Sequence, residues 1–405
     1  MEEWKEYKLE DVCTDLSDGL HKAPKFVNGG DFIFVNAKNI SNGFIVDNDP
    51  TKKSTYEEFV KYSSPLNETT VLYSIDGTIG NIALYRGEKC ILGKGACYLN
   101  PNPALLDRMY LYYELQASRF KSYIDKMSTG STIKHISLKT MRNYEMRVPS
   151  INIQQQIVSI LKSLDDKIEV NRKINENLEQ QAQALFKSWF VDFEPFKNGE
   201  FVESELGMIP KGWRVGTLGE VLNLRKDSYK KGSDLTLPYM PIDVIPMHSL
   251  GVYEFKDNKE AQSSLQTFEK NDIIIGAMRV YFHRVVIAPC KGITRNTCFV
   301  LNPKKNIMWS YCILECNQDE AINYANRTSK GSTMPYAVWD NGFADYCIVI
   351  PPDSIAETFN TLLSPILEKI RDSYKESHRL AELRDTLLPK LMSGELKVNE
   401  VEECI

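Results

Sequence analysis

Two long heptad patterns, separated by 202 residues, constrain this chain more than any other feature of its sequence. The first is a seam in steps of four and three that only two asparagines interrupt: Ile157, Leu161, Leu164, Ile168, Asn171, Asn175, Leu178, Ala182, Leu185 and Trp189. The second has its polar break at the same place, now as two serines: Phe359, Leu363, Ile366, Ile370, Ser373, Ser377, Leu380, Arg384, Leu387 and Leu391. Each pattern predicts a long helix with one apolar stripe.

Both predicted helices begin with a capping pattern, Asn152 with Gln155 in the first and Ser354 with Glu357 in the second. Each would hold about 40 residues and measure about 60 Å, a length at which a single apolar stripe cannot remain in water. One such helix alone would be read as an ordinary core helix, but two copies in the same phase favour pairing. The polar layers then fix the register. The residues expected to make the helix pairing are Ile157, Leu161, Leu164, Ile168, Leu178, Leu185, Phe359, Leu363, Ile366, Ile370, Leu380 and Leu387.

The segments that precede the two heptad patterns also resemble each other. Trp4, Leu9 and Val12 recur with the same spacing 209 residues later, and three further matches follow in the same order. They pair residues 70–74 with 272–276, 97–101 with 298–303 (one residue inserted), and the Gly-Ser-Thr triplet at 130–132 with that at 331–333. Residues 82–85 and 285–288, which follow the first of these matches, also read as strands. Short β-branched and aromatic runs broken by Gly, Asn and Pro predict that both segments are rich in strands.

The predicted fold class is therefore α+β, with a pseudo-two-fold internal repeat and four regions. Two β-rich globular domains, residues 1–149 and 199–350, are each followed by a helical region, residues 150–198 and 351–405, and the two helices form an antiparallel coiled coil. The tail after Gly394 is expected to be mobile. Antiparallel pairing would place a similar globular domain at each end of a rod, an arrangement suited to a two-fold polymer such as DNA, whose helical turn is about 34 Å.

Composition and motifs exclude several classes of protein. The 405 residues contain no run of 18 apolar residues and no N-terminal apolar leader, so neither a membrane span nor a signal peptide is expected. Nine cysteines without a C-x-x-C pair suggest reduced thiols and a cytoplasmic location. The sequence has neither a G-x-x-x-x-G-K-[ST] phosphate loop nor a His/Cys/Asp cluster at metal-binding spacing, and a net charge of −5 requires any nucleic-acid surface to be a local basic cluster or to be completed by partner subunits.

The whole arrangement resembles the specificity subunit of type I restriction–modification systems. The residues that carry the resemblance are Gly207–Trp213 near the start of the second domain, Asp76–Gly80 in the first, both Gly-Ser-Thr triplets, Leu164–Ile168 and Phe186–Phe190. Each motif is weak alone, but their order together with the duplicated helices is specific. The resemblance extends over essentially the full length of the chain.

The resemblance implies a DNA-binding function without catalysis in this chain. Each domain would be a target recognition domain that reads one half of a split double-stranded DNA target, while the helices set the unspecified spacer. Two modification (methyltransferase) subunits and a restriction (translocase and endonuclease) subunit would be the partners. S-adenosylmethionine, ATP and magnesium are expected on those partners, and no cofactor or metal on this chain. Two alternatives remain: a scaffold that binds only proteins, and a standalone enzyme, which the missing motifs disfavour.

Residue types suited to phosphates and base edges identify the candidate DNA-binding side chains. They are Lys94, Lys126, Ser131, Thr132, Lys134, His135, Lys139 and Arg142 in the first domain, and Arg279, Tyr281, Arg284, Arg295, Asn296, Lys330, Ser332, Thr333 and Tyr336 in the second. Each could instead be an ordinary solvated side chain. The second triplet precedes Met-Pro-Tyr-Ala, whereas the first precedes Ile-Lys-His-Ile, so the two domains are expected to make different contacts.

Overall fold

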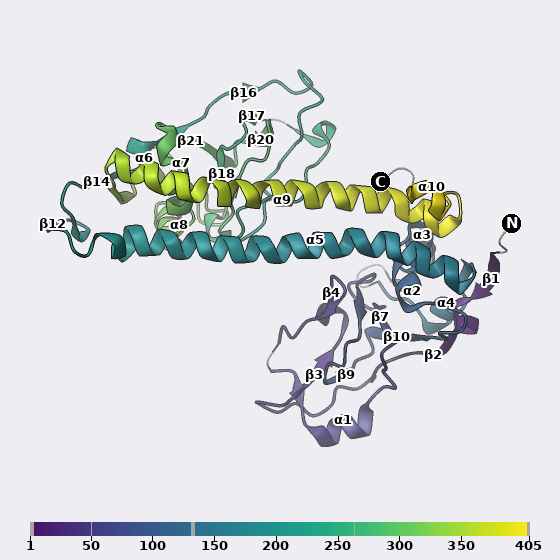
Figure 1. Cartoon of the computed structure of the whole chain (residues 1–405). Coiled ribbons are helices and arrows are strands. Elements are labelled where there is room, and N and C mark those ends of the chain that lie inside the picture. Colours follow the sequence, from purple (N-terminus) through teal and green to yellow (C-terminus); the bar gives the residue numbers. More distant parts are fainter. Residues whose placement is uncertain (1–3, 50, 131–133, 263, 403–405) are drawn as a thin grey trace. The chain divides into compact units, whose positions relative to one another are not determined.

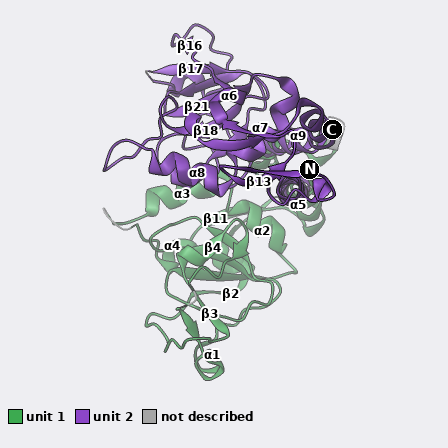
Figure 2. Ribbon diagram, turned by 90° about the vertical axis from the view of Figure 1, so that its left-hand side faces the viewer, with its two compact units in different colours: residues 1–165, 382–405 green, residues 166–381 purple. Residues whose placement is uncertain are grey.

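The computed structural model describes residues 4–49, 51–130, 134–262 and 264–402. It divides into two compact units: Met1–Asp165 with Glu382–Ile405 (unit 1), and Asp166–Ala381 (unit 2), as Figure 2 shows. The division crosses both long helices, so each unit contains a stretch of each helix together with one β-rich body. The predicted boundaries of the four regions remain predictions.

Unit 1 is built around a four-stranded antiparallel sheet in the order β2-β10-β7-β8. Every residue of β7, β8 and β10 is buried, because the strands are apolar on both faces and both faces are covered. The strands of unit 1 are β1 (Lys5–Lys8), β2 (Cys13–Asp18), β3 (Phe32–Val35), β4 (Ile40–Ser41), β5 (Phe44–Ile45), β6 (Lys53–Ser54), β7 (Val71–Ser74), β8 (Ile82–Leu84), β9 (Cys90–Leu92), β10 (Ala96–Pro101) and β11 (Glu145–Val148). Its shorter helices are α1 (Tyr56–Tyr62), α2 (Arg108–Glu114), α3 (Ser118–Met127), α4 (Leu138–Arg142) and α10 (Val398–Glu402).

Unit 2 repeats this topology, with a sheet in the order β15-β21-β18-β19 and a two-stranded β14-β22 ladder that corresponds to β1-β11. The strands are β12 (Phe201–Ser204), β13 (Gly207–Pro210), β14 (Arg214–Thr217), β15 (Leu222–Leu224), β16 (Ser228–Tyr229), β17 (Leu265–Phe268), β18 (Ile273–Gly276), β19 (Val285–Ile287), β20 (Gly292–Arg295), β21 (Cys298–Pro303) and β22 (Cys347–Ile350). The helices are α6 (Leu218–Val221), α7 (Trp309–Cys316) and α8 (Asp319–Arg327). The predicted α+β class and internal repeat are confirmed.

One predicted correspondence between the repeats is wrong by one residue. In β10 Tyr98 is paired with Leu72 of β7, and in β21 Val300 is paired with Ile274 of β18. Tyr98 and Val300 are 202 residues apart, and so are Leu72 and Ile274, so the strands of the two repeats correspond without an inserted residue. Cys97 therefore does not correspond to Cys298, because the neighbouring strand fixes the register and the shared residue type is coincidental.

The two predicted helices form and pair in antiparallel order. They are α5 (Ile151–Phe186), continued by a π-helical turn at Lys187–Val191, and α9 (Asp353–Ser393), which run side by side within unit 2 (Figure 1). In unit 2 the centres of the Trp189 and Phe359 rings lie 5.4 Å apart, and Asn171 donates to Ser377. A later residue of α5 therefore faces an earlier residue of α9, which shows that the helices are antiparallel. Every residue of both predicted seams is buried or half-buried.

Two details at the ends of the helices differ from the predictions. Because α5 begins at Ile151 and α9 at Asp353, Asn152 and Ser354 lie inside the first turn and are not caps. The segment after Gly394, which was expected to be mobile, contains the helix α10, and Val401 of this helix is buried.

Three further observations concern the described residues only. None of their helices combines the length and the apolar composition needed to span a bilayer. Their eight cysteines carry free thiols. They contain no group of three or more His, Cys, Asp or Glu side chains arranged to hold a metal ion.

Candidate functional site

Three loops meet beside the central sheet of unit 1 and are joined by backbone hydrogen bonds. Ile75, just after β7, is the junction: its amide donates to the carbonyl of Gly95 (3.0 Å), and its carbonyl accepts from Ile136 (2.9 Å). The amide of Gly77 then donates to the carbonyl of Lys134 (3.1 Å). We call residues 75–80, 93–95 and 128–136 loop cluster 1; residues 131–133, which include the predicted site residues Ser131 and Thr132, lie outside the described part of the chain.

Unit 2 contains the same arrangement, which we call loop cluster 2 (residues 277–283, 295–297 and 329–337). Ala277, just after β18, donates to the carbonyl of Thr297 (2.8 Å) and accepts from the amide of Ala337 (2.8 Å). The amide of Arg279 donates to the carbonyl of Pro335 (2.8 Å). Each of these bonds corresponds to one in loop cluster 1 at a separation of 201 or 202 residues, so the repeat extends to the hydrogen bonds of the loops.

The side chains on this shared backbone differ between the two clusters. Where loop cluster 1 has Asp76, Lys94, Lys134 and His135, loop cluster 2 has Met278, Asn296, Pro335 and Tyr336. An antiparallel bridge joins Asp76 to His135 in the first and Met278 to Tyr336 in the second, which confirms these correspondences. One backbone arrangement therefore presents two different chemical surfaces.

The charges of the clusters also differ. The three segments of loop cluster 2 contain Arg279, Arg295 and Lys330 and no Asp or Glu, in a chain whose net charge is −5. Loop cluster 1 contains Lys94 and Lys134 together with one acid, Asp76. Local positive charge in an acidic chain is the pattern required for contact with phosphates.

Arg279 has an unusual backbone conformation for its residue type. Its φ is +51°, whereas the corresponding residue of loop cluster 1, Gly77, has a φ of +74°. Glycine adopts this left-handed region freely, but a side chain there costs about 1–2 kcal/mol. Strain of this kind is typically retained where the side chain has a function.

The structure places the predicted DNA-binding residues in two groups. Exposed are Lys94, Lys126, Lys134, Lys139, Tyr281, Arg295, Asn296, Lys330, Ser332, Thr333 and Tyr336; half-buried are His135, Arg142, Arg279 and Arg284. The clusters bring together most of them, but Lys126 is on α3, Lys139 and Arg142 are on α4, and Arg284 follows loop cluster 2.

Two of these predicted residues also have structural partners. Arg142 donates to the carbonyl of Leu16 (2.9 Å), and Arg284 donates to the carbonyls of Ile242 (2.7 Å) and Ile245. The DNA contacts of all the candidates remain predictions.

Sequence reasoning did not select Asp76 or Met278 as site residues, although both belong to the clusters and form the bridges just described. Applying the 202-residue separation residue by residue would have found Met278 at the position that corresponds to Asp76. Met334, which lies between the predicted residues Thr333 and Tyr336, is 51% exposed.

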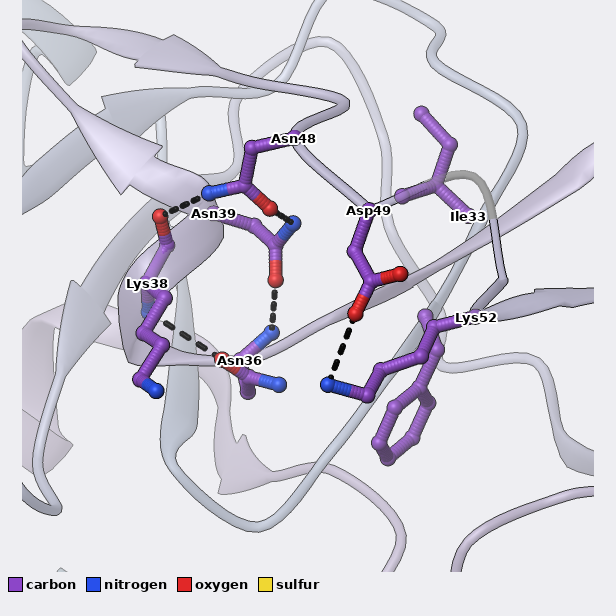
Figure 3. A pocket seen from close by; sticks show the side chains of 8 residues that line it. Ile33, Asn36, Lys38, Asn39, Asn48, Asp49 and Lys52 are labelled. Carbon is purple, nitrogen blue, oxygen red and sulfur yellow. Dashed lines mark hydrogen bonds and ion pairs between the residues drawn. The ribbon is translucent and has the colours of Figure 1, made fainter.

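Among the hollows in the described part of unit 1, two bear on the choice of site. One of about 350 Å³ adjoins loop cluster 1 and is lined by Ile79, Lys121, Asp125 and Lys134 among others. The second, of about 220 Å³, is shown in Figure 3.

The polar groups of the second hollow bind mainly each other. Asn39 donates to the side-chain oxygen of Asn48 (2.8 Å), Asn48 donates to the carbonyl of Lys38 (2.8 Å), and Asp49 pairs with Lys52 (2.8 Å), as Figure 3 shows. These interactions hold the loop together, so loop cluster 1 is the better candidate site in this unit.

The predicted polar layer of the helix pair lies in unit 2 and is buried. The side-chain amide of Asn171 donates to Ser377 (3.3 Å) and to Glu376 (2.9 Å). Asn175 and Ser373, one turn along each helix, are each 1% exposed, and their side chains have no hydrogen-bond partner among the described residues. If one helix shifted along the other, Asn171 would lose its hydrogen-bond partners as well. This supports a role of the polar layer in fixing the register of the helix pair.

A buried carboxyl joins the β-rich body of unit 2 to its helices. Glu179 of α5 accepts hydrogen bonds from the amide of Leu250 (3.2 Å), from Ser249 (3.2 Å) and from Tyr374 of α9 (3.3 Å). Burial raises the pKa of Glu179 to about 7, although these three hydrogen bonds favour the charged form. Gly251 lies so close that an added Cβ would be 1.8 Å from the Tyr374 ring.

In unit 1 the two helices are joined by an ion pair. Asp165 of α5 accepts from Arg384 of α9 (2.7 Å) and from Tyr113 of α2 (2.7 Å). This explains why an arginine stands at a position of the predicted apolar seam: its charged end is paired across the helices.

Comparison with known proteins agrees with this architecture. The type I restriction modification DNA specificity domain matches residues 1–180. The type I restriction enzyme MjaIX specificity subunit of Methanocaldococcus jannaschii is 29% identical over 98% of this chain and 95% of its own length. The HindI specificity subunit of Haemophilus influenzae is 23% identical over 98% of this chain and 100% of its own length.

A solved structure shows the same fold. The S subunit of a type I restriction–modification system from M. genitalium has a TM-score of 0.60 to this chain at 19% identity, covering 96% of both chains. The full-length similarity to the specificity subunits, the family domain in the first half and the duplicated fold agree with one another. Over its full length the chain is similar to type I restriction enzyme specificity subunits, and its first 180 residues match the type I restriction modification DNA specificity domain.

Proposed function

We propose that this chain is the sequence-specific DNA-binding subunit of a type I restriction–modification complex. Loop clusters 1 and 2 each read one half of a bipartite double-stranded target. The observation that supports this most strongly is the shared hydrogen-bonded backbone that carries different side chains in the two units. An equivalent backbone enters an equivalent groove, while different side chains select different bases.

The proposal assigns the spacer between the half-sites to the helix pair. The buried polar layer in unit 2 favours one register of the helix pair, and under this proposal that register sets the spacer. Because DNA rotates by a full turn every 10–10.5 base pairs, a fixed spacing selects one spacer length.

The chemistry of the complex would belong to other subunits. We infer that two modification subunits and a restriction subunit bind this chain, and that S-adenosylmethionine, ATP and magnesium bind to those subunits. The chain itself would contribute recognition and assembly but no catalytic group.

The test is DNA binding by the complex of this chain with its modification subunits, measured by filter binding at two salt concentrations. The proposal predicts tight binding to duplexes that contain both half-sites and a fall in affinity with salt. It also predicts a large loss when one base pair is added to the spacer. Absent or salt-independent binding would favour the scaffold alternative, and methylated product from the lone chain would favour an enzyme.

A further inference from the structure

Loop cluster 2 exposes three large side chains that a folded protein usually covers. Tyr281 is 47% exposed, Met334 51% and Tyr336 46%, and all three lie on two loops that the hydrogen bond from Arg279 to Pro335 joins. An exposed group of apolar side chains on joined loops is typical of a contact surface.

The backbone holds these side chains in place. Lys330 and Tyr336 exchange two backbone hydrogen bonds of 2.9 Å, which close the loop that carries Met334, and Gly331 within it has a φ of +89°. Tyr336 is further bridged to Met278. The backbone that carries the exposed side chains of this loop is therefore held by contacts within the chain.

The turn that carries Tyr281 is equally well anchored. It is the short turn Val280–Phe282, whose Val280 is buried, and it is followed by His283. The ring of His283 contacts Asn317 (2.9 Å) and Asp319 (3.2 Å) on and beside α8. The turn cannot swing inward to bury Tyr281 without breaking these contacts.

The charge around the apolar tips suits duplex DNA as the partner. Arg279, Arg295 and Lys330 lie on the same three segments, which contain no acidic residue. Their side chains have no hydrogen-bond or ion-pair partner among the described residues, so they are available for phosphates. Within the major groove the C5-methyl group of thymine is the apolar feature that such tips can contact.

Loop cluster 1 has a different character at the matching positions. Asp76, Lys134 and His135 stand where loop cluster 2 has Met278, Pro335 and Tyr336. Ile79, which corresponds to Tyr281, is apolar but half-buried. The described loops of loop cluster 1 therefore present mainly polar and charged groups.

We propose that unit 2 recognises thymine in its half-site, with Met334 and Tyr336 packed against thymine C5-methyl groups in the major groove, whereas unit 1 reads its half-site through polar contacts. This inference rests on the proposed DNA-binding function and adds the chemical basis of its specificity.

The experiment uses deoxyuridine, which lacks only the C5-methyl group of thymine. After the target has been mapped, the half-site that belongs to unit 2 is identified as the one that changes when residues 199–350 are exchanged. Duplexes with thymine replaced by deoxyuridine in one half-site at a time are then bound to the complex with modification subunits. Removing a contacted methyl in the unit 2 half-site should weaken binding about fourfold. The same replacement in the other half-site should change the Kd by less than about twofold.

Two variants assign the effect to named side chains. In a complex with Met334→Ala the effect of deoxyuridine at one position should disappear, because the methyl then has no partner. Met127→Ala, which shortens a methionine of α3 that is 50% exposed outside both clusters, should retain the full effect. Both residues are exposed, and thermal unfolding checks that each variant is folded.

Three results would overturn the inference. They are a unit 2 half-site without thymine on either strand, an unchanged Kd with deoxyuridine there, and a full deoxyuridine effect in Met334→Ala. A complex that does not distinguish the target from a scrambled duplex would instead refute the proposed function. Specific binding that ignores the methyl groups would refute only this inference.

Discussion

Replacing Glu179 with glutamine should stabilise the chain at pH 8 and have little effect at pH 5. Burial in unit 2 raises the pKa of this carboxyl from 4.5 to about 7, so folding favours its protonated form. The stability this provides is fully present below pH 4.5 and is lost as the pH rises through 7. Two pH units between pH 5 and the folded pKa, at 1.36 kcal/mol each, make the loss about 3 kcal/mol.

The glutamine variant avoids this loss because it stays neutral while its side-chain oxygen can still accept from Leu250 and Ser249. The free energy of unfolding would be measured by urea denaturation at both pH values. Tryptophan fluorescence suits the assay because four of the five tryptophans belong to unit 2: Trp189, Trp213, Trp309 and Trp339. Glu368→Gln, an exposed change on α9, is the matched control and should show no such difference between pH 5 and pH 8. An equal effect of Glu179→Gln at the two pH values would refute the reasoning.

Four other substitutions test separate parts of the structure. Asn175→Leu should raise the free energy of unfolding by about 1–2 kcal/mol, because the buried amide has no hydrogen-bond partner among the described residues; a loss in urea denaturation would contradict this. Gly251→Ala should cost about 2 kcal/mol or more, since the new methyl would overlap the Tyr374 ring, and unchanged thermal stability would show that the loop adapts. Ile370→Asp should prevent pairing of the helices and assembly with modification subunits, so an intact complex in gel filtration would argue against the seam. Arg279→Gly should weaken DNA binding and lower the salt slope by about one while relieving backbone strain; an unchanged slope would remove this residue from the phosphate contacts.

The sequence predicted the features that depend on regular spacing. A heptad register specifies which residues face the partner helix, and the match of Asn171 with Ser377 follows from it. The equivalence of the two sheets was visible in the sequence because each repeat contains the same succession of apolar runs, but their strand order comes from the structure alone. Cys97 was wrongly matched with Cys298 because an identical residue type was preferred to the separation of 202 residues that the paired strands share.

The loop clusters could not be predicted because long-range backbone hydrogen bonds define them. Nothing in the spacing of Ile75, Gly95 and Ile136 indicates that their main chains meet. The role of an arginine also depends on its surroundings: Arg284 donates to the carbonyls of Ile242 and Ile245, whereas Arg279 has no side-chain partner among the described residues. Because both residues are arginines, the sequence predicts the same role for each, and only the structure distinguishes their roles.

The central claim is that two equivalent loop clusters read two different half-sites independently. The most direct measurement is a genome-wide map of methylated adenines in cells that express this chain with its proposed partner subunits, compared with cells in which residues 199–350 come from a similar type I specificity subunit. The account predicts a split target in which one half changes and the other half stays the same. A change in both halves, or a target without a spacer, would contradict it.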